Sequence, residues 1–291
     1  MALLSSRIRP IAASVAIGGV GTGLLYTYFV RNVDADSAAP RKVFGKGPAF
    51  VSLPLESAEE VNHNTKRLRF RLPNPDDVSG LTLTSAVLTL SWPKGRWTPV
   101  ARPYTPISAM NEPGTLELLV KKYPDGKQST HLHSLQPGDK LLFAAALRGH
   151  QWQPNSSPHV TLIAGGAGIT PIYQLAQGIL RNPEDKTAVT LIYGANTDQD
   201  ILLMKEFKEL KTEFGERLRV EYTVSRADKG SPWREGRVTK DLLEEIQGSR
   251  KAEGPVFVCG PPPMEASLVG SKTEKGILED LGYLKSQIHT F

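Results

Sequence analysis

Cysteine is almost missing from this chain. Cys259 is the single cysteine among 291 residues, which excludes an internal disulfide and any iron-sulfur cluster or cysteine-rich zinc site made from this chain alone. The sequence also lacks an internal repeat, a low-complexity block and a long basic run. Despite a net charge of +5, no pattern in it predicts nucleic-acid binding. Any redox chemistry would therefore need a bound organic cofactor.

Charged residues are missing from one N-terminal stretch. None occurs between Ile11 and Val30, and about twenty residues at roughly 1.5 Å rise per residue just span a bilayer core as a helix. Arg9 precedes the stretch and Arg31 follows it. We therefore expect residues 1–31 to hold a single N-terminal membrane anchor or targeting segment. Its many alanines and glycines leave a cleaved targeting signal open as the alternative.

The remaining sequence predicts a linker and two domains, because 291 residues exceed what one hydrophobic core usually organises. Residues 32–47 have no apolar period and are typical of a linker. From 48 to about 150, apolar and polar residues alternate in short stretches. Leu68, Phe70 and Leu72, for example, alternate with three arginines, which a strand would place together on one basic face. Such strands with little helix predict an antiparallel β-barrel domain over 48–150. The other strand candidates there are 86–91, 115–122 and 140–144.

Over 151–291 the pattern changes to alternating strands and helices. Val160 to Ala164 is a continuous apolar run, and glycines and a helical stretch over 172–180 follow it. The same alternation continues to the end of the chain and predicts an α/β domain built on a doubly wound parallel sheet. The later candidates are strands at 188–193, 218–224 and 256–259 and helices at 200–214, 238–246 and 277–281.

The first of three chemical motifs is Arg-Pro-Tyr-Thr-Pro at 102–106. Arg102 offers a cationic guanidinium, Tyr104 a flat phenol ring and Thr105 a hydroxyl, all within one extended segment. These are the groups needed to hold a flavin and its diphosphate. The alternative is structural, with Arg102 as a surface cation and Tyr104 as a core residue.

The other two motifs each follow an apolar strand. One is Gly-Gly-Ala-Gly-Ile-Thr-Pro at 165–171 and the other is Cys-Gly-Pro-Pro-Pro-Met at 259–264. In an open parallel sheet, ligands bind at the carboxyl ends of strands, where glycines let a phosphate approach backbone amides. Pro171 replaces the third glycine of the usual dinucleotide fingerprint. Either motif could therefore cradle a nicotinamide nucleotide or be a stiff connection, and Cys259 is expected to be a buried small residue.

The order and spacing of these motifs resemble the NADH-cytochrome b5 reductase family of ferredoxin-reductase-type flavoproteins. The resemblance covers about Val43 to Phe291 and implies an FAD-binding barrel followed by an NAD(P)H-binding domain. Its fungal mitochondrial branch is the most similar. The segments that resemble this branch are 152–155, 173–176, 182–186, 200–203 and 281–283.

The resemblance also implies roles for individual residues. Arg102 would pair with the FAD diphosphate, Tyr104 would lie against the isoalloxazine or ribityl chain, and Thr105 would bond the flavin near N5. Thr170 would contact both flavin and nicotinamide, so Thr105 and Thr170 are the expected catalytic residues. The other cofactor-binding residues that it implies are Lys121, Gly126, Lys127, Ser129, Gly165, Gly166, Gly168, Pro171, Cys259, Gly260, Pro261, Pro262, Met264 and Phe291.

Some of these implied roles are specific. Lys121 matches a flavin-contacting lysine, and Gly126, Lys127 and Ser129 match a loop that wraps the diphosphate. Phe291 would close the dinucleotide cleft.

The sequence departs from the family pattern at three places. Gln128 stands where methionine is usual, and an Ala-Ala pair at 145–146 stands where relatives carry Gly-Pro. Ser225 and Arg226 replace an acidic residue that could accept from the adenosine ribose. Serine plus arginine could bind a 2′-phosphate, because arginine offers phosphate a bidentate fork. We therefore expect NADH to be the electron donor. Relaxed specificity, or a preference for NADPH, stays open as the alternative.

As a function, the resemblance implies hydride transfer from nicotinamide C4 to flavin N5, then single-electron steps to cytochrome b5 or a similar haem protein. An acidic surface on that partner would meet basic residues beside the flavin cleft. A quinone or oxygenase acceptor and a flavin-free scaffold module remain open. No metal site is expected, and His131 and His133 are interpreted as structural. The implied location is the mitochondrial outer membrane, with a soluble intermembrane-space form as an alternative.

Overall fold

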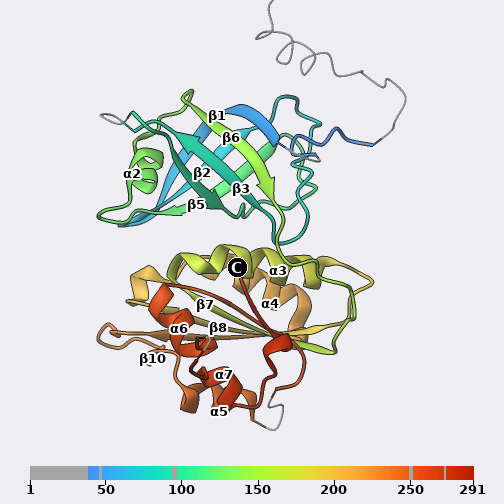
Figure 1. The fold of residues 1–291 in the computed structure, drawn as a ribbon, viewed down its shortest axis with the longest axis vertical. Helices are drawn as coiled ribbons and strands as arrows, with labels where there is room; N and C mark the ends of the chain where they lie inside the picture. Colours follow the sequence, from blue (N-terminus) through green and yellow to red (C-terminus); the bar gives the residue numbers. More distant parts are fainter. Residues whose placement is uncertain (1–38, 46–47, 94–96, 249–251, 272) are drawn as a thin grey trace, which may run out of the picture. The chain divides into compact units, whose positions relative to one another are not determined.

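Figure 1 shows the fold in a computed structural model of the protein, which describes residues 39–45, 48–93, 97–248, 252–271 and 273–291. The chain divides into two compact units, Met1–Ala39 and Pro40–Phe291. The anchor predicted over 1–31 lies outside the described residues. Within the described ranges, no helix is both long and apolar enough to cross a membrane.

Six antiparallel strands form the first sheet, in the order β4-β3-β6-β1-β2-β5. Because β4 and β5 are its two ends, this sheet is a half-barrel where the sequence predicts a barrel, and it is called the barrel below. The side chains of β2 alternate between the two faces of the sheet, as the predicted period of two requires: Leu68 and Phe70 are fully buried, and Arg69 and Arg71 are exposed. The buried side chains form one core inside the barrel. The strands are β1 (Pro48–Asn62), β2 (Thr65–Arg71), β3 (Ala86–Ser91), β4 (Val100–Tyr104), β5 (Thr115–Lys121) and β6 (Lys140–Leu147).

The arginine face of β2 differs from the basic outer side that the sequence predicts, because two of its charges are paired. Arg69 lies opposite Glu117 on β5, and its Nε donates to Glu117 Oε1 at 2.7 Å. Arg67 forms ion pairs with the same carboxylate and with Glu206 of α4 (Met204–Phe214). The arginines of this face therefore connect β2 to β5 and to α4, and the face is not a free cationic surface.

A helix replaces the loop expected after β5. Residues Lys127–Ser134 form α2, which starts at the N-cap Gly126. The stretch is polar and lacks a clear helical period, so the pattern did not reveal it. Leu132 is fully buried in the barrel core and holds α2 against the strands.

The barrel also includes residues 41–45, which the sequence analysis assigns to the linker. Val43 and Phe44 are buried in the barrel core. Their amides donate to the carbonyls of Val78 and Ser79 at 3.0 and 2.8 Å. Two apolar side chains within a polar stretch are thus enough to fix it.

The second sheet is parallel throughout, with the order β10-β9-β8-β7-β11-β12. Helices α3 and α4 pack on one face, and α5, α6 and α7 on the other, as the predicted doubly wound sheet requires. The strands are β7 (His159–Gly165), β8 (Ala188–Ala195), β9 (Leu218–Val224), β10 (Arg234–Glu235), β11 (Val256–Cys259) and β12 (Ile288–Thr290). The other helices are α3 (Ile169–Arg181), α5 (Lys240–Gln247), α6 (Pro262–Val269) and α7 (Ile277–Asp280), with 3₁₀ turns at Gly166–Gly168, Asp198–Asp200, Gly215–Arg217 and Lys285–Gln287.

A buried aspartate fastens the segment that joins the two sheets. Asp185 accepts hydrogen bonds from Trp152 Nε1 at 2.7 Å and from the amides of Asn155 and Thr187 at 3.2 and 3.0 Å. Burial would raise the pKa of this carboxyl, but the hydrogen bonds outweigh burial and hold the pKa below its ordinary value. The segments 152–155 and 182–186, both similar to the fungal branch, therefore meet in one structural cluster.

Candidate functional site

The three motifs meet at one cavity. β7 ends at Gly165 and β11 at Cys259, and Ala164 pairs with Cys259 across these parallel strands. The strand order reverses between β7 and β11, which is where ligands bind in doubly wound sheets. β4 brings Arg102 and Tyr104 to the same cavity from the barrel. Its volume of about 1260 Å³ exceeds the roughly 300–1,000 Å³ typical of small-molecule pockets, so it offers room for a dinucleotide.

Most of the residues that the sequence analysis assigns to the site line this cavity. They are Arg102, Tyr104, Thr105, Lys121, Gly126, Lys127, Ser129, Gly165, Gly168, Thr170, Pro171, Cys259, Gly260, Pro261, Pro262 and Phe291. The assigned residues outside the lining are Gly166, Ser225, Arg226 and Met264.

The barrel supplies a cation and a phenol. Arg102 is exposed, and its Nη1 donates to the carbonyl of Ala101 at 2.7 Å. Burial raises the pKa of Tyr104 to about 12, although the nearby Arg102 charge opposes the shift. The Tyr104 hydroxyl therefore stays protonated at neutral pH and can donate a hydrogen bond to a ligand.

The start of α2 adds backbone donors to the barrel side. No side chain caps this helix at Gly126, and the first amides of a helix have no intrahelical acceptor. Ser129 Oγ donates to the Gly126 carbonyl at 3.0 Å and accepts from the Tyr123 amide at 3.2 Å, which fixes the turn. With Arg102, which lines the same cavity, this helix start fits a diphosphate.

Glycines on the sheet side let the protein pack against itself. A Cβ at Gly168 would lie 2.2 Å from the carbonyl oxygen of Cys259. Cβ atoms at Gly165 and Gly260 would lie 2.4 and 2.8 Å from the sulfur of Met264. These glycines thus bring the two loops together and also line the cavity, and the expected approach of a phosphate to them stays a prediction. Met264 is in contact with the loops and lies outside the cavity lining.

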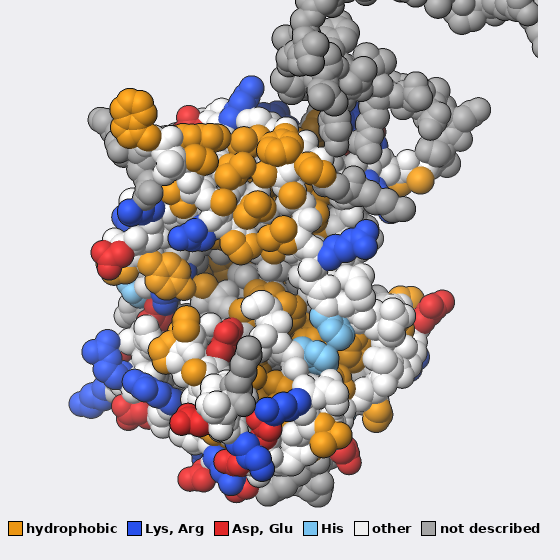
Figure 2. All heavy atoms as spheres, in the orientation of Figure 1, with side chains coloured by type: hydrophobic (Ala, Val, Ile, Leu, Met, Phe, Trp, Pro, Cys, Tyr) orange, Lys and Arg blue, Asp and Glu red, His pale blue; other side chains and the backbone are white. Residues whose placement is uncertain are grey.

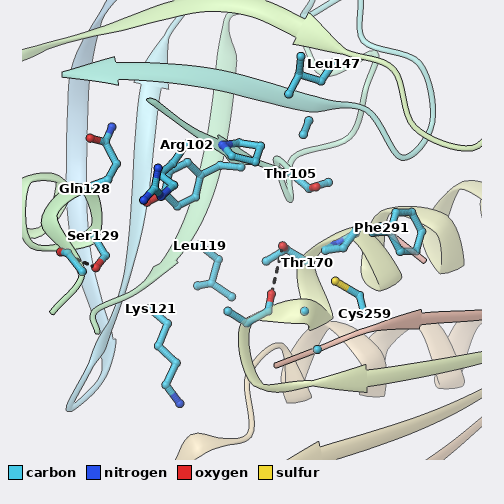
Figure 3. A pocket seen from close by; sticks show the side chains of 18 of the residues that line it. Arg102, Thr105, Leu119, Lys121, Gln128, Ser129, Leu147, Thr170, Cys259 and Phe291 are labelled. Atoms are coloured by element: carbon cyan, nitrogen blue, oxygen red, sulfur yellow. Dashed lines mark hydrogen bonds between the residues drawn. The ribbon is translucent and has the colours of Figure 1, made fainter. Parts of the chain in front are cut away.

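Two threonines come from opposite sides of the cavity. Thr105 follows β4 of the barrel, and Thr170 is the second residue of α3. Figure 3 shows them on facing sides of the cavity. Thr170 Oγ1 donates to the Ala167 carbonyl at 3.3 Å, which orients it. Pro171 suits the first turn of α3, where a missing amide hydrogen costs nothing.

The cavity ends near Cys259 and Phe291. Burial raises the pKa of the Cys259 thiol to about 12, and the Glu265 charge adds to the shift. The thiol therefore stays protonated, in agreement with its interpretation as an unreactive small residue. The Phe291 ring is 38% exposed and lies 5.9 Å from the Phe257 ring.

Lys121 lines the cavity and also forms an ion pair, while its expected flavin contact stays a prediction. Its side chain points away from Arg102 in Figure 3, and its Nζ lies 2.8 Å from Asp200 Oδ1. Burial would raise the pKa of Asp200, but hydrogen bonds from Lys121, Thr197 and Asn64 hold it below its ordinary value. The Lys121 ammonium is thus already paired with a carboxylate.

Ser225 and Arg226 lie beyond the cavity, directly after β9. Their amides donate to the carbonyls of Ala195 and Asn196 at 2.9 and 3.0 Å, which ties this turn to the end of β8. Both residues are exposed. They therefore occupy the carboxyl edge of the sheet, where a nucleotide would extend from the cavity.

Sequence reasoning missed several lining residues. Gln128, noted from the sequence only as a departure from the family pattern, is buried. Its Nε2 donates to Thr89 Oγ1 at 2.9 Å and its Oε1 accepts from Ser91 Oγ at 2.5 Å, so it ties α2 to β3. Leu119 lies on the same face of β5 as Glu117 and Lys121, so it is apolar where the alternation predicts a polar residue, and it packs in the core around α3. The segment 147–150, which begins at the last residue of β6, carries no motif that would have pointed to it.

The two halves of the chain match two known domain families. Residues 52–150 match the oxidoreductase FAD-binding domain, and residues 162–269 match the oxidoreductase NAD-binding domain. The cluster of Arg102, Tyr104 and the start of α2 fits FAD. The loops that follow β7 and β11 fit the nicotinamide nucleotide.

Close relatives cover almost the whole chain. A protein from Pyricularia oryzae named NADH-cytochrome b5 reductase 2 is 46% identical over 292 residues, which cover 97% of this chain and 88% of the relative. The protein of the same name from Emericella nidulans is 42% identical, over 99% and 92%. Among solved structures, the cytochrome b5 reductase domain of Ulva prolifera nitrate reductase has a TM-score of 0.74 at 28% identity and covers 87% of this chain and 100% of its own.

Arg102→Ala is expected to weaken FAD binding by about 10- to 100-fold, because charge-assisted hydrogen bonds contribute roughly 1.5–3 kcal/mol. Quenching of flavin fluorescence on titration of the FAD-free protein measures the dissociation constant. Arg71→Ala, at an exposed arginine on β2, is the matched control and should bind like the wild type. Equal FAD affinity in Arg102→Ala and Arg71→Ala would contradict the assignment.

Proposed function

Because the chain belongs to the NADH-cytochrome b5 reductase family, we propose that it carries a hydride from NADH to FAD and then single electrons to a cytochrome b5-type haem protein. It is an oxidoreductase, and FAD and NADH are its cofactors. The observation that supports the proposal best is the cavity in which Thr105 of the barrel faces Thr170 of α3. Bound FAD supplies the ability to accept two electrons and release them singly.

The chain's own residues would hold and orient the two cofactors. Arg102 and the start of α2 would hold the diphosphate, and Tyr104 would support the flavin. The Thr105 hydroxyl would donate to the flavin near N5, and Thr170 would orient the nicotinamide. No side chain needs to act as a general base, and the protonated Cys259 thiol takes no part.

Charges around the cavity favour an acidic partner. Arg102, Lys127 and Arg148 line the cavity and are exposed, whereas Asp125 is the acidic lining residue among those described. Because Arg102 and Lys127 would face the FAD diphosphate, Arg148 is the lining arginine left to meet a partner. A cationic rim speeds encounter with an anionic surface and loses this effect as salt screens it. An acidic surface around the exposed haem edge of a cytochrome b5 would therefore dock here.

The rate of cytochrome b5 reduction by NADH is expected to fall as ionic strength rises. At low salt, Arg148→Ala should lower the second-order rate constant by roughly two- to fivefold. Lys240→Ala, at an exposed lysine on α5 away from the cavity, should leave it unchanged. Stopped-flow haem absorbance measures the rate, and a salt-independent rate would argue against this docking surface. A wild-type enzyme that reduces a quinone but not cytochrome b5 would favour another acceptor.

We also propose that Arg226 gives the enzyme some use of NADPH. Its exposed position at the carboxyl edge of the sheet supports this, as does the absence of a carboxylate at Ser225 and Arg226. Arg226→Ala should lower kcat/KM for NADPH by about 10- to 100-fold and leave kcat/KM for NADH within about twofold. Ser225→Asp should act in the same direction, because a carboxylate repels the 2′-phosphate. Equal losses with both nucleotides would rule this specificity role out.

Membrane attachment is a further part of the proposal. We propose that residues 11–30 anchor the enzyme in the mitochondrial outer membrane, because they are uncharged and lie between Arg9 and Arg31. In alkaline carbonate extraction, the full chain should stay with the membrane pellet and a chain starting at Pro40 should be released. Protease treatment of intact mitochondria then tests the address. Release of the full chain by carbonate would contradict the anchor.

A further inference from the structure

Helix α3 serves the cavity at one end and holds the barrel further along. Thr170, its second residue, lines the cavity. Gln174 and Gln177 follow one and two turns later, on the same side of the helix. Both side chains are almost fully buried, at 4% and 5% exposure. Buried amides must find hydrogen-bond partners, and these two find theirs in the barrel.

Their partners are the three residues that follow Thr105. Gln174 Nε2 donates to the carbonyl of Pro106 and, at 2.7 Å, to that of Ser108. Gln177 Nε2 donates to the carbonyl of Ile107 at 3.3 Å and to Gln174 Oε1 at 3.2 Å. One helix therefore holds three consecutive barrel carbonyls.

The segment 106–108 is also fixed from the barrel side. The Ile107 amide donates to the Glu117 carbonyl at 2.8 Å, and Ser108 Oγ accepts from the Glu117 amide at 3.1 Å. A shift of α3 would therefore be transmitted to β5 and to Thr105. Because Pro106 directly follows Thr105, and Gln174 lies one turn from Thr170, the mechanical path between the two threonines is short.

We propose that Gln174 is a positioning residue that sets the distance between the Thr105 and Thr170 sides of the cavity. The inference rests on the proposed function, since this distance governs how closely the nicotinamide approaches the flavin. Gln177 supports it by holding the Gln174 amide oxygen. Effective hydride transfer needs the reacting atoms within about 3–3.5 Å, and a misplacement of about 1 Å can cost about 100-fold in rate.

Two other contacts between the barrel and the parallel-sheet domain do not involve the segment that follows Thr105. Lys121 pairs with Asp200, and Arg67 pairs with Glu206. These contacts use long side chains that can follow a small displacement. The amide of Gln174 contacts the backbone itself, so it transmits such a displacement directly.

Gln174→Glu tests the proposal with little change in shape. A carboxylate would face two carbonyl oxygens and repel them, whereas a protonated carboxyl could donate one hydrogen bond. Burial beside carbonyls raises the pKa of such a group. In the full-length FAD-loaded protein, the limiting rate of flavin reduction by NADH should fall about 10- to 100-fold at about pH 8. It should recover partly at about pH 6, while the NADH dissociation constant changes little.

A second measurement does not depend on turnover. Hydrogen–deuterium exchange of the peptide containing Ile107 and Glu117 should become faster in Gln174→Glu at about pH 8, because the segment loses its α3 contacts. Gln174→Met, which removes the donors without adding charge, should show a smaller effect with no recovery at low pH. It also keeps the test informative if the glutamate variant does not fold.

Gln247→Glu is the matched control. Gln247 is a buried glutamine on α5 of the same sheet domain, and its amide donates to the Tyr283 hydroxyl at 2.7 Å, with no role in the cavity. It should change neither the rate of flavin reduction nor exchange at 107–117. The charged groups that line a pocket together with Gln177 are Arg67, Glu112, Glu117, Arg181 and Glu206, and Arg67 is ion-paired with both Glu117 and Glu206.

A wild-type rate and wild-type exchange in both Gln174 variants would overturn the proposal. Equal effects in Gln174→Glu and Gln247→Glu would also overturn it, since they would reflect general destabilisation. If NADH does not reduce the wild-type flavin, the proposed function fails, and the exchange measurement still decides whether Gln174 holds the segment.

Discussion

The fold of the cavity depends on one close approach, between Gly168 and the backbone of Cys259. Any side chain at Gly168 would lie 2.2 Å from the Cys259 carbonyl oxygen. This contact brings the loop after β7 against the loop after β11, at the point where the strand order reverses. Helix α3 begins at this contact. Its position places Thr170 in the cavity lining and Gln174 within hydrogen-bond distance of the barrel. The position of α3 beside the cavity thus follows from how tightly these two loops pack.

Regular periods made much of the architecture predictable. The alternation around Leu68 and Phe70 identified β2, and the apolar run from Val160 to Ala164 identified β7, because burial on one or both faces dictates those patterns. The motif containing Arg102 could also be placed at a ligand site, since its three functional groups are adjacent in sequence. Local chemistry and local period are the information that a single sequence carries most directly.

Contacts between distant residues could not be predicted in this way. The residues next to Lys121 in the sequence do not indicate that its ammonium pairs with Asp200. Those next to Gln174 do not indicate that its amide donates to carbonyls that follow Thr105. Helix α2 escaped detection because Leu132 is its one apolar residue, and its other buried residues, Gln128 and Ser129, are polar. Met264 belonged to a motif but packs under the glycines, since a motif does not show which side of a loop faces the cavity.

The central claim is that one cavity holds FAD where NADH can reduce it, and an anaerobic titration of the full-length FAD-loaded protein with NADH tests it most directly. The visible flavin absorbance is predicted to bleach in proportion to the NADH added, until the flavin is fully reduced. A colourless protein that cannot be loaded with FAD would contradict the account. So would a bound flavin whose spectrum NADH leaves unchanged.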